Sequence, residues 1–264
     1  MSRLPRIRLN TLTHFFLGIS LLGLVLVAAL TFSTQSSEVI SPRQRFVVGL
    51  VFGLICFLGI IAGVFPSRCS RIFHFQEERG GRLVSREKLD SMRTEYIAFE
   101  GHHPDCEDFS AHVFQMGGKK YCAGCTGLVA GAVISLFGTL VFFSTEIVLG
   151  NMGVLVFWLG FAGAIVGLLQ HSLSRNQGSG VHLLLNTTFV LGAFLLLVGI
   201  DEITGDLFLE GYFLVLTLYW ILTRMFLSRQ EHRRICRACG LESCPHFEKK
   251  ELASTPLGDA IDGA

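Results

Sequence analysis

The hydrophobic pattern divides the chain into six apolar runs separated by polar segments. The runs are Thr11 to Phe32, Phe46 to Phe65, Thr126 to Phe143, Ile147 to Leu169, Val181 to Ile200 and Leu207 to Leu227. Each run is about 20 residues long, the length that an α-helix needs to cross the hydrocarbon core of a bilayer. The first run is too long for the apolar part of a signal peptide. The pattern predicts an all-α membrane protein with six transmembrane helices.

The polar segments predict two extramembrane parts. We expect four regions: residues 1–66 with the first two helices, 67–125 as a loop, 126–228 with the other four helices, and 229–264 as a tail. The first half of the loop mixes both charge signs, which is typical of a solvated helix-and-turn region at the membrane surface. The loop is too short to build its own core without a staple such as a bound metal.

Composition agrees with a membrane protein whose main partner is the lipid bilayer. Hydrophobic residues make up 50% of the chain, and charged residues make up only 16%. An ordinary soluble domain has about 25% charged residues. Mean hydropathy is +0.53. Because the formal net charge is only +1, no general basic field attracts nucleic acid, which we do not expect as a partner.

The distribution of lysine and arginine predicts the orientation. If the N-terminus is inside, 20 of the 22 basic residues fall on the cytosolic side, and only Arg43 and Arg45 fall outside. The outer connections carry acidic residues instead, namely Glu38, Glu146, Asp201, Glu202 and Asp206. Cytosolic segments of membrane proteins are enriched in basic residues. We therefore predict a multi-pass protein of the cell membrane with both termini in the cytosol.

Metal-ligand residue types crowd together just before the third apolar run. Between Gly101 and Gly127 stand three cysteines and three histidines: Cys106, Cys122, Cys125, His102, His103 and His112. The spacing of Cys122 and Cys125 lets both sulfurs face one ion. The intervening pattern HVFQM, Gly117-Gly118, KKYC predicts two short strands joined by a glycine turn, because glycine readily enters the positive φ angles of a tight hairpin. The segment therefore predicts a small zinc-ribbon-like module.

A second cluster of ligand types lies in the tail. Its members are Cys236, Cys239, Cys244 and His246. A Cys-x-x-Cys-Gly sequence is typical of a zinc knuckle. The tail could form a site by itself, or Cys122, Cys125, Cys236 and Cys239 could share one ion. The spacing leaves both arrangements open.

The motif Tyr121-Cys-Ala-Gly-Cys-Thr-Gly-Leu128, with Cys106 upstream and an apolar helix after it, resembles a known family. This is a family of small prokaryotic integral membrane proteins classified as a domain of unknown function, with a Cys-Ala-x-Cys-Thr-Gly hallmark that opens a membrane helix. The resemblance covers about the central third of the chain. Glu107 and Gly124 stand where family members commonly have histidine and arginine. The resemblance implies a membrane location and a metal site, and it implies no established reaction.

Polar residues and glycines within the apolar runs allow further interpretations. His171, His182, Asn186, Thr187 and Thr188 form either a polar patch between helices or part of a site that faces the metal module. Glycine pairs four residues apart, such as Gly127/Gly131 and Gly163/Gly167, favour close helix packing, within one bundle or at a homodimer surface.

These observations leave three hypotheses for function. In the first, zinc stabilises a cytosolic module with a binding or scaffold role toward a cytosolic protein. In the second, the chain is a metal-dependent membrane enzyme for a lipid or lipid-linked substrate, with His103, Asp105 or Asp108 in acid–base roles. In the third, the cysteines hold an iron–sulfur cluster or act as redox thiols, since Cys122 would lie at a helix N-terminus that favours its thiolate.

Overall fold

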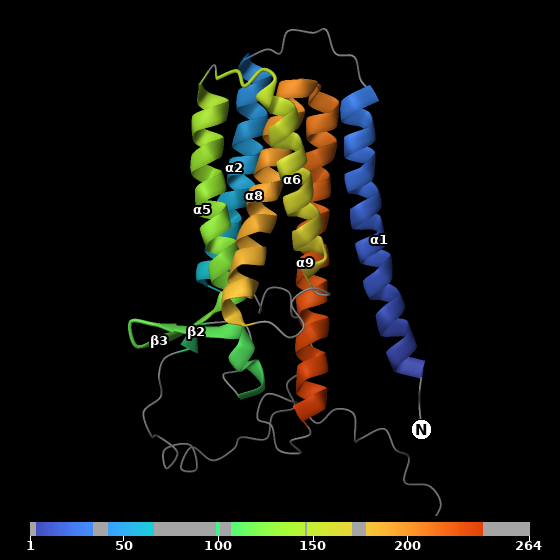
Figure 1. The fold of residues 1–264 in the computed structure, drawn as a ribbon, viewed down its shortest axis with the longest axis vertical. Coiled ribbons are helices and arrows are strands. Elements are labelled where there is room, and N and C mark those ends of the chain that lie inside the picture. Colours follow the sequence, from blue (N-terminus) through green and yellow to red (C-terminus); the bar gives the residue numbers. More distant parts are fainter. Residues whose placement is uncertain are drawn as a thin grey trace, which may run out of the picture.

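In the described part of the chain, six long helices form a bundle, and a small sheet lies at one end of it (Figure 1). The computed structural model describes residues 4–33, 42–65, 99–100, 107–145, 147–170 and 178–239. The helices are α1 (Leu4–Ser33), α2 (Pro42–Val64), α5 (Ala123–Ser144), α6 (Met152–Leu168), α8 (Ser179–Ile203) and α9 (Leu207–Cys239). The remaining elements are the strands β1 (Phe99–Glu100), β2 (Val113–Met116) and β3 (Lys119–Cys122) and the 3₁₀ helix η1 (Glu107–His112).

Five of the helices in the described part of the chain are long and apolar enough to cross a membrane: α1, α2, α5, α8 and α9. The outer faces of these helices carry large exposed apolar side chains, such as Leu22, Phe137 and Val215. Such a surface suits lipid rather than water. The prediction of an all-α, multi-pass membrane protein is therefore confirmed.

Helix α6 is shorter than the apolar run that predicted it. It has 17 residues and begins at Met152, whereas the run begins at Ile147. Gly150 adopts a left-handed conformation with φ of 54°, which interrupts helical geometry because only glycine enters that region freely. Residues 147–149 therefore belong to the connection between α5 and α6, although their side chains are apolar.

Helix α8 is the centre of the packing. It lies against α5 on one side and α6 on the other, while α5 also packs against α2 and α1 packs against α9. Two of the predicted glycine positions explain how closely these helices approach. A Cβ atom on Gly127 of α5 would collide with the backbone of α8 at Leu183, and one on Gly163 of α6 would lie 3.1 Å from the Cα atom of Gly192. The packing of the bundle itself thus uses these small residues.

The predicted hairpin is present. Strands β2 and β3 pair antiparallel, with Val113 opposite Cys122 and Met116 opposite Lys119. Gly117 and Gly118 make the turn with φ angles of 59° and 75°, the two positive values that a two-residue type I′ turn requires. Strand β1 joins the other side of β3 in parallel.

The hairpin lies at the end of the bundle where α5 begins and α9 ends, which we call the hairpin end (Figure 1). The opposite end, where α2 and α9 begin, is the far end. Helix α9 continues to Cys239, beyond the predicted end of its apolar run at Leu227. Cys236 and Cys239 thus occupy the last turn of a helix instead of the predicted knuckle turn, because the polar residues that precede them continue the helix.

Candidate functional site

The hairpin places Cys122 directly at the start of α5. Cys122 is the N-cap residue, and its side chain is buried at 2% exposure. The hydroxyl of Thr126 donates a hydrogen bond of 3.0 Å to the carbonyl oxygen of Cys122. Cys125 follows in the first turn and is partly exposed. The Cys-x-x-Cys motif therefore lies between the sheet and a membrane helix.

Two histidines connect the sheet region to the bundle. His112 ends η1, and its ring centroid lies 4.2 Å from that of His182 near the start of α8. The ring of Phe109, which is fully buried, lies 6.0 Å from His112. Helices α8 and α9 both contact η1. His182 thus faces the module formed by η1, β2 and β3.

A half-buried arginine holds three helices together beside this histidine pair. Arg224 of α9 donates through Nη1 to the carbonyl oxygen of Gly167 at 2.6 Å, and through Nη2 to Oε1 of Gln170 at 2.6 Å and to Oδ1 of Asn186. Its guanidinium also lies over the ring of Phe189 at 5.1 Å. Gly167 lies in α6, Gln170 follows that helix directly, and Asn186 lies in α8. Arg224 therefore fixes the relative positions of α6, α8 and α9.

Asn186 and Gln170 extend this network to His182. The Nδ2 atom of Asn186 donates to the carbonyl oxygen of His182 at 2.6 Å. The Nε2 atom of Gln170 lies 3.5 Å from Nδ1 of His182. A Cβ atom added to Gly124 would lie 3.7 Å from Asn186 Nδ2 and 3.8 Å from Cys122 Sγ. The polar cluster of Arg224, Gln170, Asn186 and His182 therefore ends close to Cys122, with Gly124 between Asn186 and the Cys122 sulfur.

Thr187 attaches α8 to the start of α5. Its hydroxyl lies 3.0 Å from the carbonyl oxygens of both Gly127 and Leu183. This contact is of the helix-packing kind that one sequence interpretation predicted for the polar patch. The contacts of His182 with His112 and Gln170 are of the kind expected if the patch faces the module at the hairpin end. The patch thus contributes both to packing and to the polar cluster.

The predicted metal ligands lie only partly within the described chain. In the parts that the structure describes, no three or more histidine, cysteine, aspartate or glutamate side chains are grouped so that they could hold a metal ion. His102, His103, Asp105, Cys106, His171, Cys244 and His246 lie outside the described residues, as does the charged segment that starts at Ser67. For Asp108, Cys236 and Cys239 only the backbone is described. The complete ligand sets therefore stay predictions.

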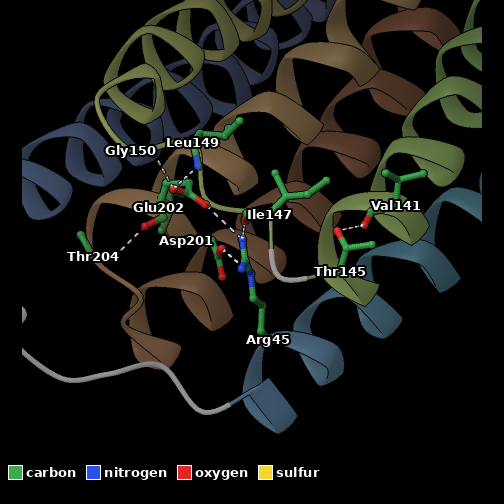
Figure 2. Close-up of polar contacts among 10 residues, drawn as sticks. Arg45, Val141, Thr145, Ile147, Leu149, Gly150, Asp201, Glu202 and Thr204 are labelled. Carbon is green, nitrogen blue, oxygen red and sulfur yellow. Dashed lines mark hydrogen bonds and ion pairs between the residues drawn. The ribbon is translucent and has the colours of Figure 1, made fainter.

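A second polar cluster lies at the far end (Figure 2). Arg45 of α2 pairs through Nε with Oδ2 of Asp201 at 2.9 Å and through Nη2 with Oε1 of Glu202 at 3.1 Å. Its Nη2 also donates to the carbonyl oxygen of Ile147 at 3.1 Å, and its guanidinium lies 4.3 Å from the centre of the Phe142 ring. The pairs join α2 to α8 inside the bundle.

Glu202 fixes the connection between α5 and α6. Its Oε2 atom accepts hydrogen bonds from the backbone N–H groups of Leu149 at 2.9 Å and Gly150 at 3.3 Å (Figure 2). Glu202 thereby satisfies donors that the turn at Gly150 leaves without helical partners.

Sequence reasoning missed the central residues of both clusters. It assigned Asp201 and Glu202 to an outer connection, whereas both lie within α8, because that helix continues to Ile203. It also counted Arg224 only as a basic residue beyond the membrane. The available signal was the position of Arg224 inside the last apolar run, since a charge within such a run usually faces the bundle interior and has polar partners.

The fold and the two clusters define an α-helical, multi-pass membrane protein with buried polar networks at both ends of its bundle. Searches with protein-family models, among curated proteins and among solved structures find no match to this chain.

Proposed function

We propose that the chain is a six-helix membrane protein whose hairpin end faces the cytosol and carries a zinc-stabilised module that binds a cytosolic protein. One observation carries this proposal: the ring contact between His112 and His182 beside the buried N-cap residue Cys122. It places imidazole side chains from η1 and α8 in contact at the end of the bundle where both cysteine motifs lie.

The proposed zinc ligands are Cys106, Cys122, Cys125 and one histidine from His102, His103 or His112. Cys236, Cys239, Cys244 and His246 bind a second ion, or Cys236 and Cys239 join the first pair of cysteines. Zinc favours four-coordinate sites of this sulfur and imidazole composition, and such closed sites are usually structural. A structural site suits a module that is too small to form its own core.

A binding role is favoured by the edge of the small sheet. Strand β2 is an outer strand of the sheet, and its last residue Met116 is 63% exposed. An outer strand offers unpaired backbone groups and side-chain positions to an extended peptide. Zinc would hold this edge in place on the bundle.

The sixth membrane crossing is assigned to α6. Its 17 residues give a length of about 25 Å at the usual rise per residue, slightly less than the hydrocarbon thickness of about 30 Å. Short helices are accommodated by local thinning of the bilayer. Six crossings place both termini on one side, in agreement with the distribution of basic residues.

Metal content tests the proposal directly. We expect anaerobically purified full-length protein to contain zinc and to be colourless. Cys122→Ser should lower the zinc content, whereas the matched control Cys56→Ser should not, because Cys56 is buried in α2 as part of the apolar core. Protein without bound metal, or Cys122→Ser protein with full zinc content, would overturn the proposal. A brown, iron-containing sample would instead support the redox alternative.

The partner role needs its own test. A photoreactive residue at position 115 would cross-link cytosolic proteins that bind this strand. Met116→Ala should reduce this cross-linking and leave zinc content and membrane insertion unchanged. Equal cross-linking with Met116 and with alanine at position 116 would argue against this strand as the binding edge.

A membrane enzyme is the second candidate, and Arg224 favours it. The guanidinium has the neutral oxygen partners Gly167, Gln170 and Asn186 in hydrogen-bond contact, and arginine suits recognition of a phosphate group on a lipid. Under this alternative, His103, Asp105 or Asp108 acts as the base. Vesicles containing phosphatidic acid should then release inorganic phosphate, and Asp105→Asn should abolish release without lowering metal content. If the unaltered protein releases no inorganic phosphate, phosphate-ester hydrolysis is not its reaction.

A further inference from the structure

Two buried carboxyl groups meet at the far end of the bundle, where α8 ends and α9 begins. Asp201 and Glu210 are each only 1% exposed, and their side chains lie within hydrogen-bonding reach of each other. Asp201 belongs to the last turn of α8, and Glu210 belongs to the first turn of α9. The pair therefore spans the corner between these two helices.

The charged groups next to this pair already have polar partners. Glu202 binds Arg45 and two backbone N–H groups, and Asp201 Oδ2 forms the other ion pair of Arg45. Among the side chains that the structure describes, Asp201 Oδ1 and Glu210 Oε1 are buried oxygens without a hydrogen-bond donor. Among the described residues, Glu210 has Asp201 as its neighbour, and the cation that acts on it, Arg45, is already paired with Asp201 and Glu202.

The charges do not balance if every carboxyl group is ionised. Asp201, Glu202 and Glu210 would carry three negative charges against the single positive charge of Arg45, in a region with little contact with water. Burial of an uncompensated charge is costly. Two ionised carboxylates also cannot hydrogen-bond each other, because both are acceptors only.

We propose that Asp201 and Glu210 form a proton-binding site, in which one proton is held by Glu210 and donated as a hydrogen bond to Asp201. The proton supplies the missing donor, places both orphan oxygens in a hydrogen-bonded pair, and removes one of the surplus negative charges. Asp201 remains ionised because it is paired with Arg45. This site is separate from the polar cluster at the hairpin end.

A metal cation fits the same position less well than a proton does. The guanidinium of Arg45 lies 2.9 Å from Asp201 Oδ2, so a metal ion bound to Asp201 would be close to a fixed positive charge. A proton needs no coordination shell and sits directly between two oxygens. The charged groups that face the pair in the described chain are Arg45 from α2, Glu202 from α8 and Asp206 from the connection.

Infrared spectroscopy of the purified full-length protein tests this assignment. At neutral pH, the unaltered protein should show the carbonyl band of a protonated carboxylic acid, and this band should move to lower frequency in D₂O. Glu210→Gln should lose the band while the protein remains folded, because the amide is similar in shape and can donate to Asp201. The control Glu202→Gln should keep the band. Absence of the band from the unaltered protein, or its persistence in Glu210→Gln, would overturn the proposal.

Thermal melting separates a proton from a metal cation. The melting temperature of the unaltered protein should fall as pH rises and the proton leaves, and Glu210→Gln should show a smaller fall. Sodium, potassium and calcium chloride should give equal melting temperatures at constant ionic strength. A rise with one of these cations that is absent from Glu210→Gln would assign a cation site and overturn the proton assignment. If Glu210→Gln fails to fold, the infrared band of the unaltered protein still decides.

Discussion

The ring centroids of His112 and His182 lie 4.2 Å apart, which attaches the small sheet region to the central helix of the bundle. His112 ends η1, and His182 lies in the first turns of α8. This contact holds η1, and with it the adjacent strand β2, against α8.

The histidine contact should be measurable as a coupling between two substitutions. We expect His112→Ala and His182→Ala to lower the free energy of unfolding non-additively, with a coupling of about 1 kcal/mol, as is typical of packed ring pairs. Denaturant unfolding in detergent, followed by tryptophan fluorescence, gives the four required values. His14→Ala combined with His182→Ala is the control and should be additive, because His14 is exposed on α1. Additive effects of the histidine pair would contradict the contact.

Loss of Arg224 should destabilise the hairpin end strongly. Arg224→Met would leave the acceptors on Gly167, Gln170 and Asn186 without this donor. Each buried acceptor without a partner costs on the order of 1–3 kcal/mol. We expect a clear fall in melting temperature and faster cleavage by protease. Arg229→Met, an exposed position of α9, is the matched control. Equal stability of the two variants would show that the network contributes little.

Removal of Arg45 should be one of the most damaging substitutions at the far end. Arg45→Met leaves the buried carboxylates of Asp201 and Glu202 without their cation, and breaking a buried pair in this way costs about 3–5 kcal/mol. The adjacent control Arg43→Met should have little effect, since Arg43 is exposed. Addition of Asp201→Asn to Arg45→Met should restore part of the stability. A further loss on that addition would contradict the ion pair.

The hairpin turn should tolerate a side chain poorly at its second glycine. Gly118 has φ of 75°, and a non-glycine residue in a left-handed conformation costs about 1–2 kcal/mol. Gly118→Ala should therefore increase hydrogen exchange of the β2 and β3 amides. Gly178→Ala is the control, because Gly178 has φ of −72° and open space around its Cα atom. Unchanged exchange in Gly118→Ala would show that the turn does not limit hairpin stability.

Elements that depend on neighbouring residues were predictable from the sequence. The two-residue turn Gly117-Gly118 predicted the hairpin, because its conformation depends on those two positions. The apolar runs predicted where helices occur, while the ends of α6 and α9 were predicted wrongly. At α6, Gly150 and the contacts of Glu202 make the helix begin later than hydropathy suggests.

The residues of the two buried clusters could not be paired from the sequence. Arg45 contacts residues of α8 and of the connection between α5 and α6, and Arg224 contacts α6 and α8. A charge count placed Arg45 and Asp201 on the same side of the membrane, but it treated them as residues of solvated connections. Burial depends on how distant helices pack, which hydropathy along one segment does not contain.

By itself, the sequence determined that this protein is an all-α membrane protein with a glycine-turn hairpin ahead of its third apolar run. Those features follow from local hydrophobicity and local backbone preference. Only the tertiary structure decided that Arg224 contacts the polar residues next to His182 at the hairpin end. At the far end, it alone decided that Arg45 pairs with Asp201 and that Glu210 has no such ion pair in the described chain. The physical reason is that a buried charge takes its partners from helices brought together by packing, wherever those helices lie in the chain.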